Sequence, residues 1–66
     1  MDQLNSIVIE LEGQIAIIKS ETAEAAERGV FSYARSKTIR QAALEIAKGA
    51  KNLRVTTLDV FKAQKA

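Results

Sequence analysis

The side chains of this 66-residue chain that could do chemistry are carboxylates and amines, because the sequence has no histidine and no cysteine. Without these residues the chain lacks the usual near-neutral general base, the thiolate nucleophile and the commonest zinc ligands. The sequence therefore excludes hydrolytic triads that use histidine, zinc sites with histidine or cysteine ligands, and a disulfide framework. We expect no metal and no cofactor.

Two carboxylate pairs, Glu10 with Glu12 and Glu21 with Glu24, are the remaining candidates for acid–base catalysis. Each pair falls in a segment with helical periodicity and no aromatic-lined cleft, where carboxylates are usually solvated surface charges. The three glycines are too far apart to form a glycine-rich phosphate loop. The sequence therefore predicts that the protein is not an enzyme and has no small-molecule substrate.

The formal net charge of +2 is the sum of two unlike halves. Residues 1–28 carry six acids and two bases, a net charge of −4, whereas residues 29–66 carry eight bases and two acids, a net charge of +6. This asymmetry favours an anionic partner for the second half. Two packed helices that neutralise each other would show the same totals, so that alternative stays open.

The elements that position these charges are predicted to be long helices. In residues 3–28, mostly apolar side chains recur at alternating spacings of four and three, which is a seven-residue helical repeat. The repeat consists of Leu4, Val8, Leu11, Ile15, Ile18, Thr22 and Ala25. Ile7, Ile9 and Ile17 widen it, so this helix needs more than one neighbour. A β-hairpin over residues 7–18, about Gly13, is an alternative because the segment is rich in β-branched residues.

A turn is predicted at residues 28–32. Gly29 follows Arg28, which is typical of a helix that ends with a cation and then a left-handed residue. Ser32 or Ser36 is expected to cap the second helix. Three bulky side chains beside the turn are expected to cover the end of the core: Val30, Phe31 and Tyr33.

The second helix is predicted from about residue 32 to residue 62 and shows the same repeat. Its apolar side consists of Ile39, Ala43, Ile46, Ala50, Leu53, Thr57 and Val60. At about 100° per residue most of its cations fall on the opposite side. Poor helix formers after Asn52 leave open a break there, which would create a short third helix that ends near Lys65.

The basic side of the second helix has the clearest chemical meaning. A rigid helix with cations at short helical spacings can contact several phosphates of a duplex without reading its sequence. The residues predicted to bind are Arg35, Lys37, Arg40, Lys48, Lys51, Arg54 and Lys62, with Arg35 and Arg54 on the flanks. Aromatic residues are not interleaved with these cations, which favours a duplex over a single strand.

A stretch of the second helix, TIRQAALEIAKGAKNLRVTTLDVFK at residues 38–62, resembles the C-terminal helix of short bacterial linker-histone-like proteins. The matching positions are Arg40, Ala42, Ala43, Leu44, Glu45, Ile46, Lys48, Lys51, Arg54, Leu58 and Lys62. Upstream, residues 15–29 resemble the acidic first helix of that family, with Arg28 and Gly29 at its end. The resemblance implies a helical hairpin with a nucleoid-associated role. The segment VFSYARSK at residues 30–37 departs from the family, whose loop is shorter and richer in bases.

These patterns predict an all-α protein with one helical domain over residues 1–66. Two long helices form an antiparallel hairpin, which dimerises or assembles further into a helical bundle because so short a chain buries little core. The side chains expected at the oligomer interface are Leu4, Val8, Leu11, Ile15, Ile18, Ile39, Ile46 and Leu53. No stretch is as apolar as a membrane span and no signal sequence is recognised, so we expect a cytoplasmic protein with no membrane partner.

The expected function is binding of double-stranded DNA without sequence specificity, in the nucleoid. The alternative is a small coiled-coil structural or adaptor protein, including one of a virus or phage. In that case the charge asymmetry would select a protein partner and its orientation.

Overall fold

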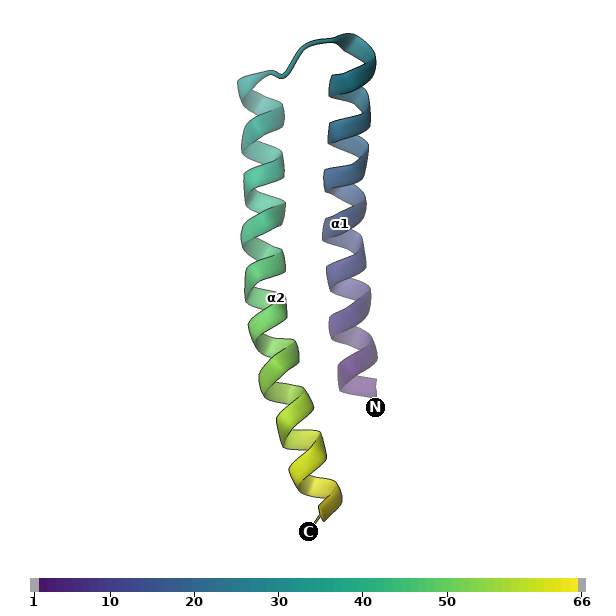
Figure 1. Cartoon of the computed structure of the whole chain (residues 1–66), viewed down its shortest axis with the longest axis vertical. Coiled ribbons are helices and arrows are strands. Elements are labelled where there is room, and N and C mark those ends of the chain that lie inside the picture. The colour runs from purple at the N-terminus through teal and green to yellow at the C-terminus, as the bar shows by residue number, and fades with distance from the viewer. Residues whose placement is uncertain (1, 66) are drawn as a thin grey trace.

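Two long helices joined by a short loop make up the computed structural model, which describes residues 2–65 (Figure 1). Helix α1 spans Asp2–Arg28 and helix α2 spans Tyr33–Lys65. They lie antiparallel and side by side, and the Cα trace measures 55 × 15 × 11 Å. The predicted all-α hairpin is confirmed. No strand occurs in the described residues, so residues 7–18 are helical and the β-hairpin alternative is wrong.

Local hydrogen bonds explain where each helix begins and ends. Gly29 adopts a φ of 69°, and its N–H donates to the carbonyl of Ala25 at 2.9 Å, which closes α1 with a left-handed residue. Ser32 is the N-cap of α2, because its Oγ accepts the N–H of Arg35 at 3.1 Å. The predicted turn at residues 28–32 is therefore confirmed.

Helix α2 runs without a break through the segment of poor helix formers. The hydroxyl of Thr56 donates to Oδ1 of Asn52 at 3.3 Å, and that of Thr57 donates to the carbonyl of Leu53 at 2.6 Å. These contacts satisfy the polar side chains within the helix instead of at a cap. No third helix is formed in residues 33–65.

The seam, by which we mean the line of contact between the two helices, follows the heptad repeat. Its members are buried or half-buried, and they are Leu4, Ile7, Leu11, Gln14, Ile18, Glu21 and Ala25 on α1 and Arg35, Ile39, Ala42, Ile46, Gly49, Leu53, Thr56 and Val60 on α2. Eight of these fifteen positions belong to the predicted stripes. The others, except Arg35, lie one residue earlier than predicted, so Val8 and Ile15 are exposed while Ile7 and Gln14 face α2.

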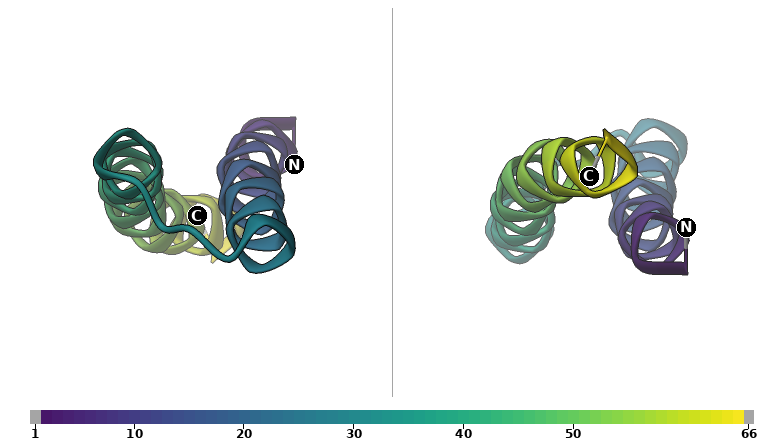
Figure 2. Two further views of the ribbon diagram at one scale, coloured as in Figure 1. Left: turned by 90° about the horizontal axis from the view of Figure 1, so that it is seen from above. Right: turned by 90° about the horizontal axis from the view of Figure 1, so that it is seen from below.

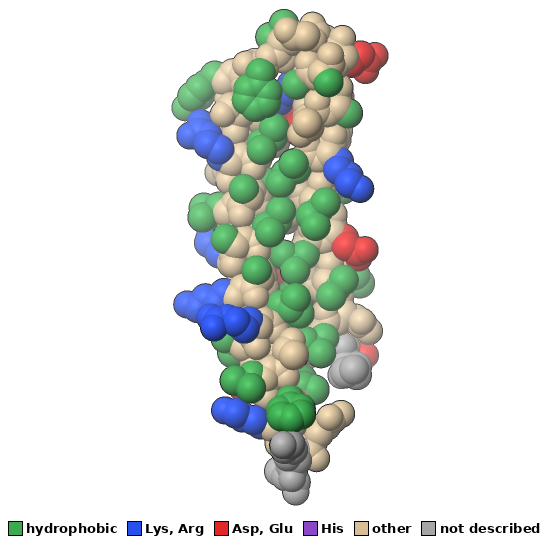
Figure 3. Space-filling model, viewed as in Figure 1, with side chains coloured by type: hydrophobic (Ala, Val, Ile, Leu, Met, Phe, Trp, Pro, Cys, Tyr) green, Lys and Arg blue, Asp and Glu red, His purple; other side chains and the backbone are tan. Residues whose placement is uncertain are grey.

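Two different broad faces result from this register. The apolar face combines Leu4, Leu11, Ile18, Ala25, Ile39, Ile46, Leu53 and Val60 of the seam with Val8, Ile15, Thr22, Ala43, Ala50 and Thr57. Antiparallel helices place equivalent heptad positions on the same side, and Figure 3 shows hydrophobic side chains of both helices along the seam. The polar face has shallow grooves lined mainly by Gln3, Glu10, Gln14, Ile17, Thr38, Glu45, Asn52 and Thr56.

The hairpin contains very little core. Among the described residues only Ile7 and Ala42 are buried, with 7% and 3% of their surface exposed. The helices approach each other closely at Gly49, where an added Cβ atom would lie 2.7 Å from Cδ2 of Leu11. Val30, Phe31 and Tyr33 are well exposed and do not cover the end of the hairpin as expected. That end holds a polar cluster instead of an apolar core.

Candidate nucleic-acid interface

Six exposed cations lie on the outer side of α2, away from the seam. We call this set the basic surface, and it consists of Lys37, Arg40, Lys48, Lys51, Arg54 and Lys62. In Figure 3 the Lys and Arg side chains gather along the outer edge of α2. At 1.5 Å per residue the basic surface extends for about 38 Å, close to the length of one duplex turn.

The acids of α2 do not interrupt this surface. Glu45 lines a groove of the polar face together with Gln14, and Asp59 follows it by two heptads in the same register. The Nζ of Lys48 lies 3.8 Å from Oε1 of Glu45, but both side chains are more than half exposed and such a pair contributes little. The guanidinium of Arg40 lies 5.8 Å from the centre of the Tyr33 ring, which orients the arginine without neutralising it.

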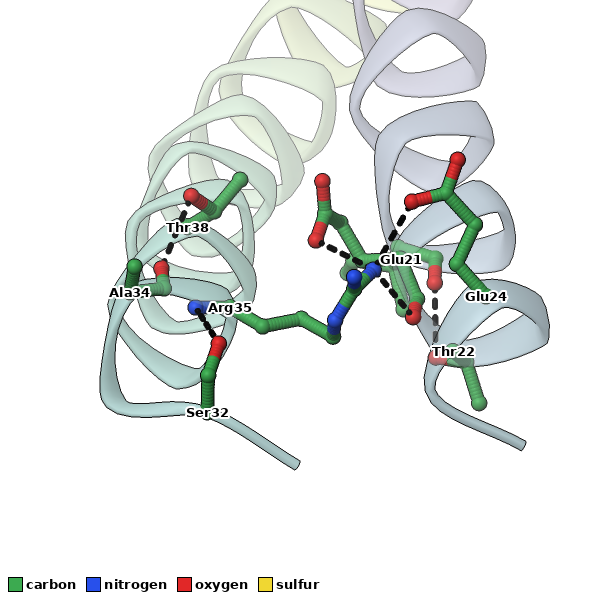
Figure 4. A network of polar contacts seen from close by, with 8 residues as sticks. Glu21, Thr22, Glu24, Ser32, Ala34, Arg35 and Thr38 are labelled. Carbon is green, nitrogen blue, oxygen red and sulfur yellow. Dashed lines mark hydrogen bonds and ion pairs between the residues drawn. The ribbon is translucent and has the colours of Figure 1, made fainter. Parts of the chain in front are cut away.

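Arg35 has a different environment from the other six predicted DNA ligands. Its Nη1 contacts Oε2 of Glu21 at 3.1 Å and Oε2 of Glu24 at 3.0 Å, and it donates to the carbonyl of Glu21 at 3.1 Å (Figure 4). The side chain is only 14% exposed, and its Nε is buried without a hydrogen-bond partner in the described structure. Arg35 therefore ties the start of α2 to the last turns of α1, and the structure does not bring it onto the basic surface.

The position of Arg35 could have been recognised from the sequence. It precedes Ile39 by four residues and Ala42 by seven, so it falls on the repeat that contacts α1. In the described part of the chain, Arg35 is also the one cation of α2 that forms an ion pair with an acid of α1. The acids of α1 therefore do not neutralise the basic surface.

The carboxylates considered for catalysis are dispersed. Glu21 and Glu24 both bind Arg35, whereas Glu10 lines a groove of the polar face and Glu12 is exposed. The described residues contain no group of three or more side chains that could hold a metal ion. The two pairs of acids therefore do not line a common pocket.

The residues predicted for the oligomer interface divide into two groups. Val8 and Ile15 are exposed on the apolar face. The other six are half-buried in the seam and also form one edge of that face: Leu4, Leu11, Ile18, Ile39, Ile46 and Leu53. All eight thus contribute to one broad side of the hairpin.

Comparisons with protein-family models, curated proteins and solved structures find no match to this chain. Its class is therefore defined by the fold alone, an antiparallel α-helical hairpin with one basic outer side. No described helix is long and apolar enough to cross a membrane.

Proposed function

We propose that the protein binds double-stranded DNA without sequence specificity, as a homodimer, through the basic surface of α2. The observation that supports this proposal is the set of six exposed cations with no acid of α1 against them. Cations spaced along a rigid rod neutralise backbone phosphates, and the release of counterions drives such binding. This function implies a histone-like role and a location in the nucleoid.

The number of cations sets the expected salt dependence. If six phosphates are neutralised by each chain, log K should fall with log[salt] with a slope near −5 per chain. Arg35 is not counted among the residues that contact phosphates. The expected slope depends only on the six residues of the basic surface. Aromatic residues do not alternate with the cations of the basic surface, and bases of a single strand would need such residues to stack on. This favours a duplex over a single-stranded ligand.

Substitution within the basic surface tests the proposal. Lys48→Gln with Lys51→Gln should lower affinity for a short duplex at least tenfold and reduce the magnitude of the slope by about 1.8 per chain. Ala16→Glu with Ala23→Glu is the matched control. It changes the net charge equally, but at exposed positions on the outer side of α1. Fluorescence anisotropy over a range of salt concentrations measures both variants. Equal losses in the two variants would contradict a localised interface.

The apolar face supports a second candidate, a coiled-coil structural or adaptor protein that acts through protein contacts. An exposed apolar strip along a helical hairpin is typical of such proteins. The same titration separates the two functions. The adaptor function requires no binding of the unmodified chain to duplex DNA at low salt and micromolar concentration, whereas the proposed function requires binding.

A further inference from the structure

None of the described residues covers the apolar face. Val8 and Ile15 project from it with 42% and 44% of their surface exposed. A contiguous apolar strip of this length is unusual for a stable monomer, and a chain of this size with so few buried side chains lacks the core to fold alone. A surface of complementary shape is therefore needed to complete the fold.

The size of the face matches a second copy of the same chain. The paired part of the hairpin is about 40 Å long and two helices are about 20 Å wide. The resulting area of about 800 Å² is what each partner contributes to a typical stable interface. We infer that two hairpins pack apolar face against apolar face into a four-helix bundle, with their loops at opposite ends.

The charged residues that flank the apolar face favour this arrangement over the other two-fold one. With the loops at the same end, α1 packs on α2 of the second copy. The hairpin register, in which Arg35 contacts Glu24 and Gly49 contacts Leu11, then places Lys19 at the level of Arg40 of the second copy. Both residues flank the apolar face, so like charges meet twice in each dimer, which is unfavourable.

With the loops at opposite ends, α1 packs on α1 of the second copy and α2 on α2. When the two-fold axis passes between the levels of Ile15 and Ala16, Glu12 lies at the level of Lys19 of the second copy, and this pair of opposite charges occurs twice. On α2 the same axis places Arg40 beside Ala47 of the second copy, so the cations that flank the apolar face do not oppose one another, and the other cations of the two α2 helices lie on the outer side. One axis position therefore suits both pairs of helices.

The exposed loop is explained by the same arrangement. Helix α2 continues past the start of α1, as Figure 1 shows, and from below its last turns are seen to lean toward α1 (Figure 2). The loop of the second copy reaches this overhang and brings Val30 and Phe31, each 62% exposed, against its apolar side. The bulky loop residues then cover the end of the partner's hairpin instead of their own.

The arrangement also has a consequence for DNA binding, and this consequence rests on the proposed function. The two α2 helices lie next to each other, so their basic surfaces join into a single broad face with twelve cations. The arrangement with loops at the same end would instead put α2 helices at diagonal corners and separate the basic surfaces. A single face engages one duplex and leaves the acidic α1 helices on the far side.

Reversal of the charge at residue 19 distinguishes the arrangements without any DNA. Lys19→Glu opposes Glu12 of the second copy, and the dimer dissociation constant should rise about tenfold because two pairs are affected. The double variant Glu12→Lys with Lys19→Glu should restore it. Neither position has a charged residue three or four places away in its own helix, so intrahelical effects are small. Tighter or unchanged dimerisation of Lys19→Glu in sedimentation equilibrium overturns the inference.

Disulfide trapping gives a second readout, since the chain has no cysteine of its own. Ile15→Cys should cross-link to itself on mild oxidation, because two copies of residue 15 meet near the axis. Ile17→Cys, on the polar face of the same helix, is the control and should remain uncross-linked. Failure of Ile15→Cys to cross-link, or equal cross-linking of both, contradicts the arrangement. If the protein passes these tests but does not bind DNA, the proposed function is wrong and the proposed dimer is supported.

Discussion

The two broad faces of the hairpin flank the same seam, yet they are built from different side chains. On the polar face the edge of the seam is formed by Gln14, Glu21 and Thr56, with shallow grooves beside them. On the apolar face Val8 and Ile15 are exposed. This difference indicates that polar contacts help to fix the register within the chain, while much of the aliphatic surface is left exposed.

The largest effect is expected when one isoleucine is replaced on each face in turn. Ile15→Gln takes two aliphatic side chains from the proposed dimer, each worth about 1.5–3 kcal/mol when fully buried, so the dissociation constant should rise about a hundredfold or more. Ile17→Gln is the matched control, because Ile17 is 39% exposed on the same helix and lies on the polar face. Sedimentation equilibrium and circular dichroism follow both variants. Equal effects would mean that the two faces are equivalent.

A smaller effect is expected from the ion-pair cluster that joins the helices near the loop. Arg35→Gln removes contacts from Nη1 to two carboxylates and a carbonyl, and should lower the free energy of unfolding by about 1–2 kcal/mol. Arg54→Gln removes the same charge from the exposed basic surface and should change stability by less than about 0.5 kcal/mol. Thermal or urea unfolding measures both. A larger loss for Arg54→Gln would contradict a structural role specific to Arg35.

The smallest effects concern the two glycines inside helices. Gly13 is exposed with nothing within 4 Å of an added Cβ, so Gly13→Ala should stabilise the protein by about 1 kcal/mol through helix propensity. Gly49→Ala offers the same propensity gain, but its Cβ would crowd Leu11 in the seam. Its net gain should therefore be smaller. Urea unfolding of the two variants compares them directly, and an equal gain at Gly49 would show that the helices are not held closely there.

The sequence predicted the helices and the turn well, because these depend on local signals. The glycine after Arg28 and the serine at position 32 each have the conformation or hydrogen bond that their type favours. The continuity of α2 past Asn52 was not predictable in the same way. Threonine hydroxyls can bond to the preceding turn as well as cap a new helix, and the structure shows the first outcome.

The register of the seam could be predicted only to within one residue. The edge with Val8 and Ile15 is more apolar than the edge with Ile7 and Gln14, so hydrophobicity alone favoured the wrong edge. The polar contacts of Arg35 and the small residue at Gly49 turn the helices toward the other edge. The basic surface was easier to recognise, because its six members lie far from the seam in either register.

Sedimentation equilibrium of the unmodified chain tests most directly the claim that a second copy completes the hairpin. At micromolar concentration and moderate salt, with helix content checked by circular dichroism, we expect a species of about 14 kDa, twice the 7.2 kDa of one chain. Dilution should cause loss of mass and of helix together, because the core forms only in the dimer. A fully helical species of 7.2 kDa that persists across the concentration range would contradict the account.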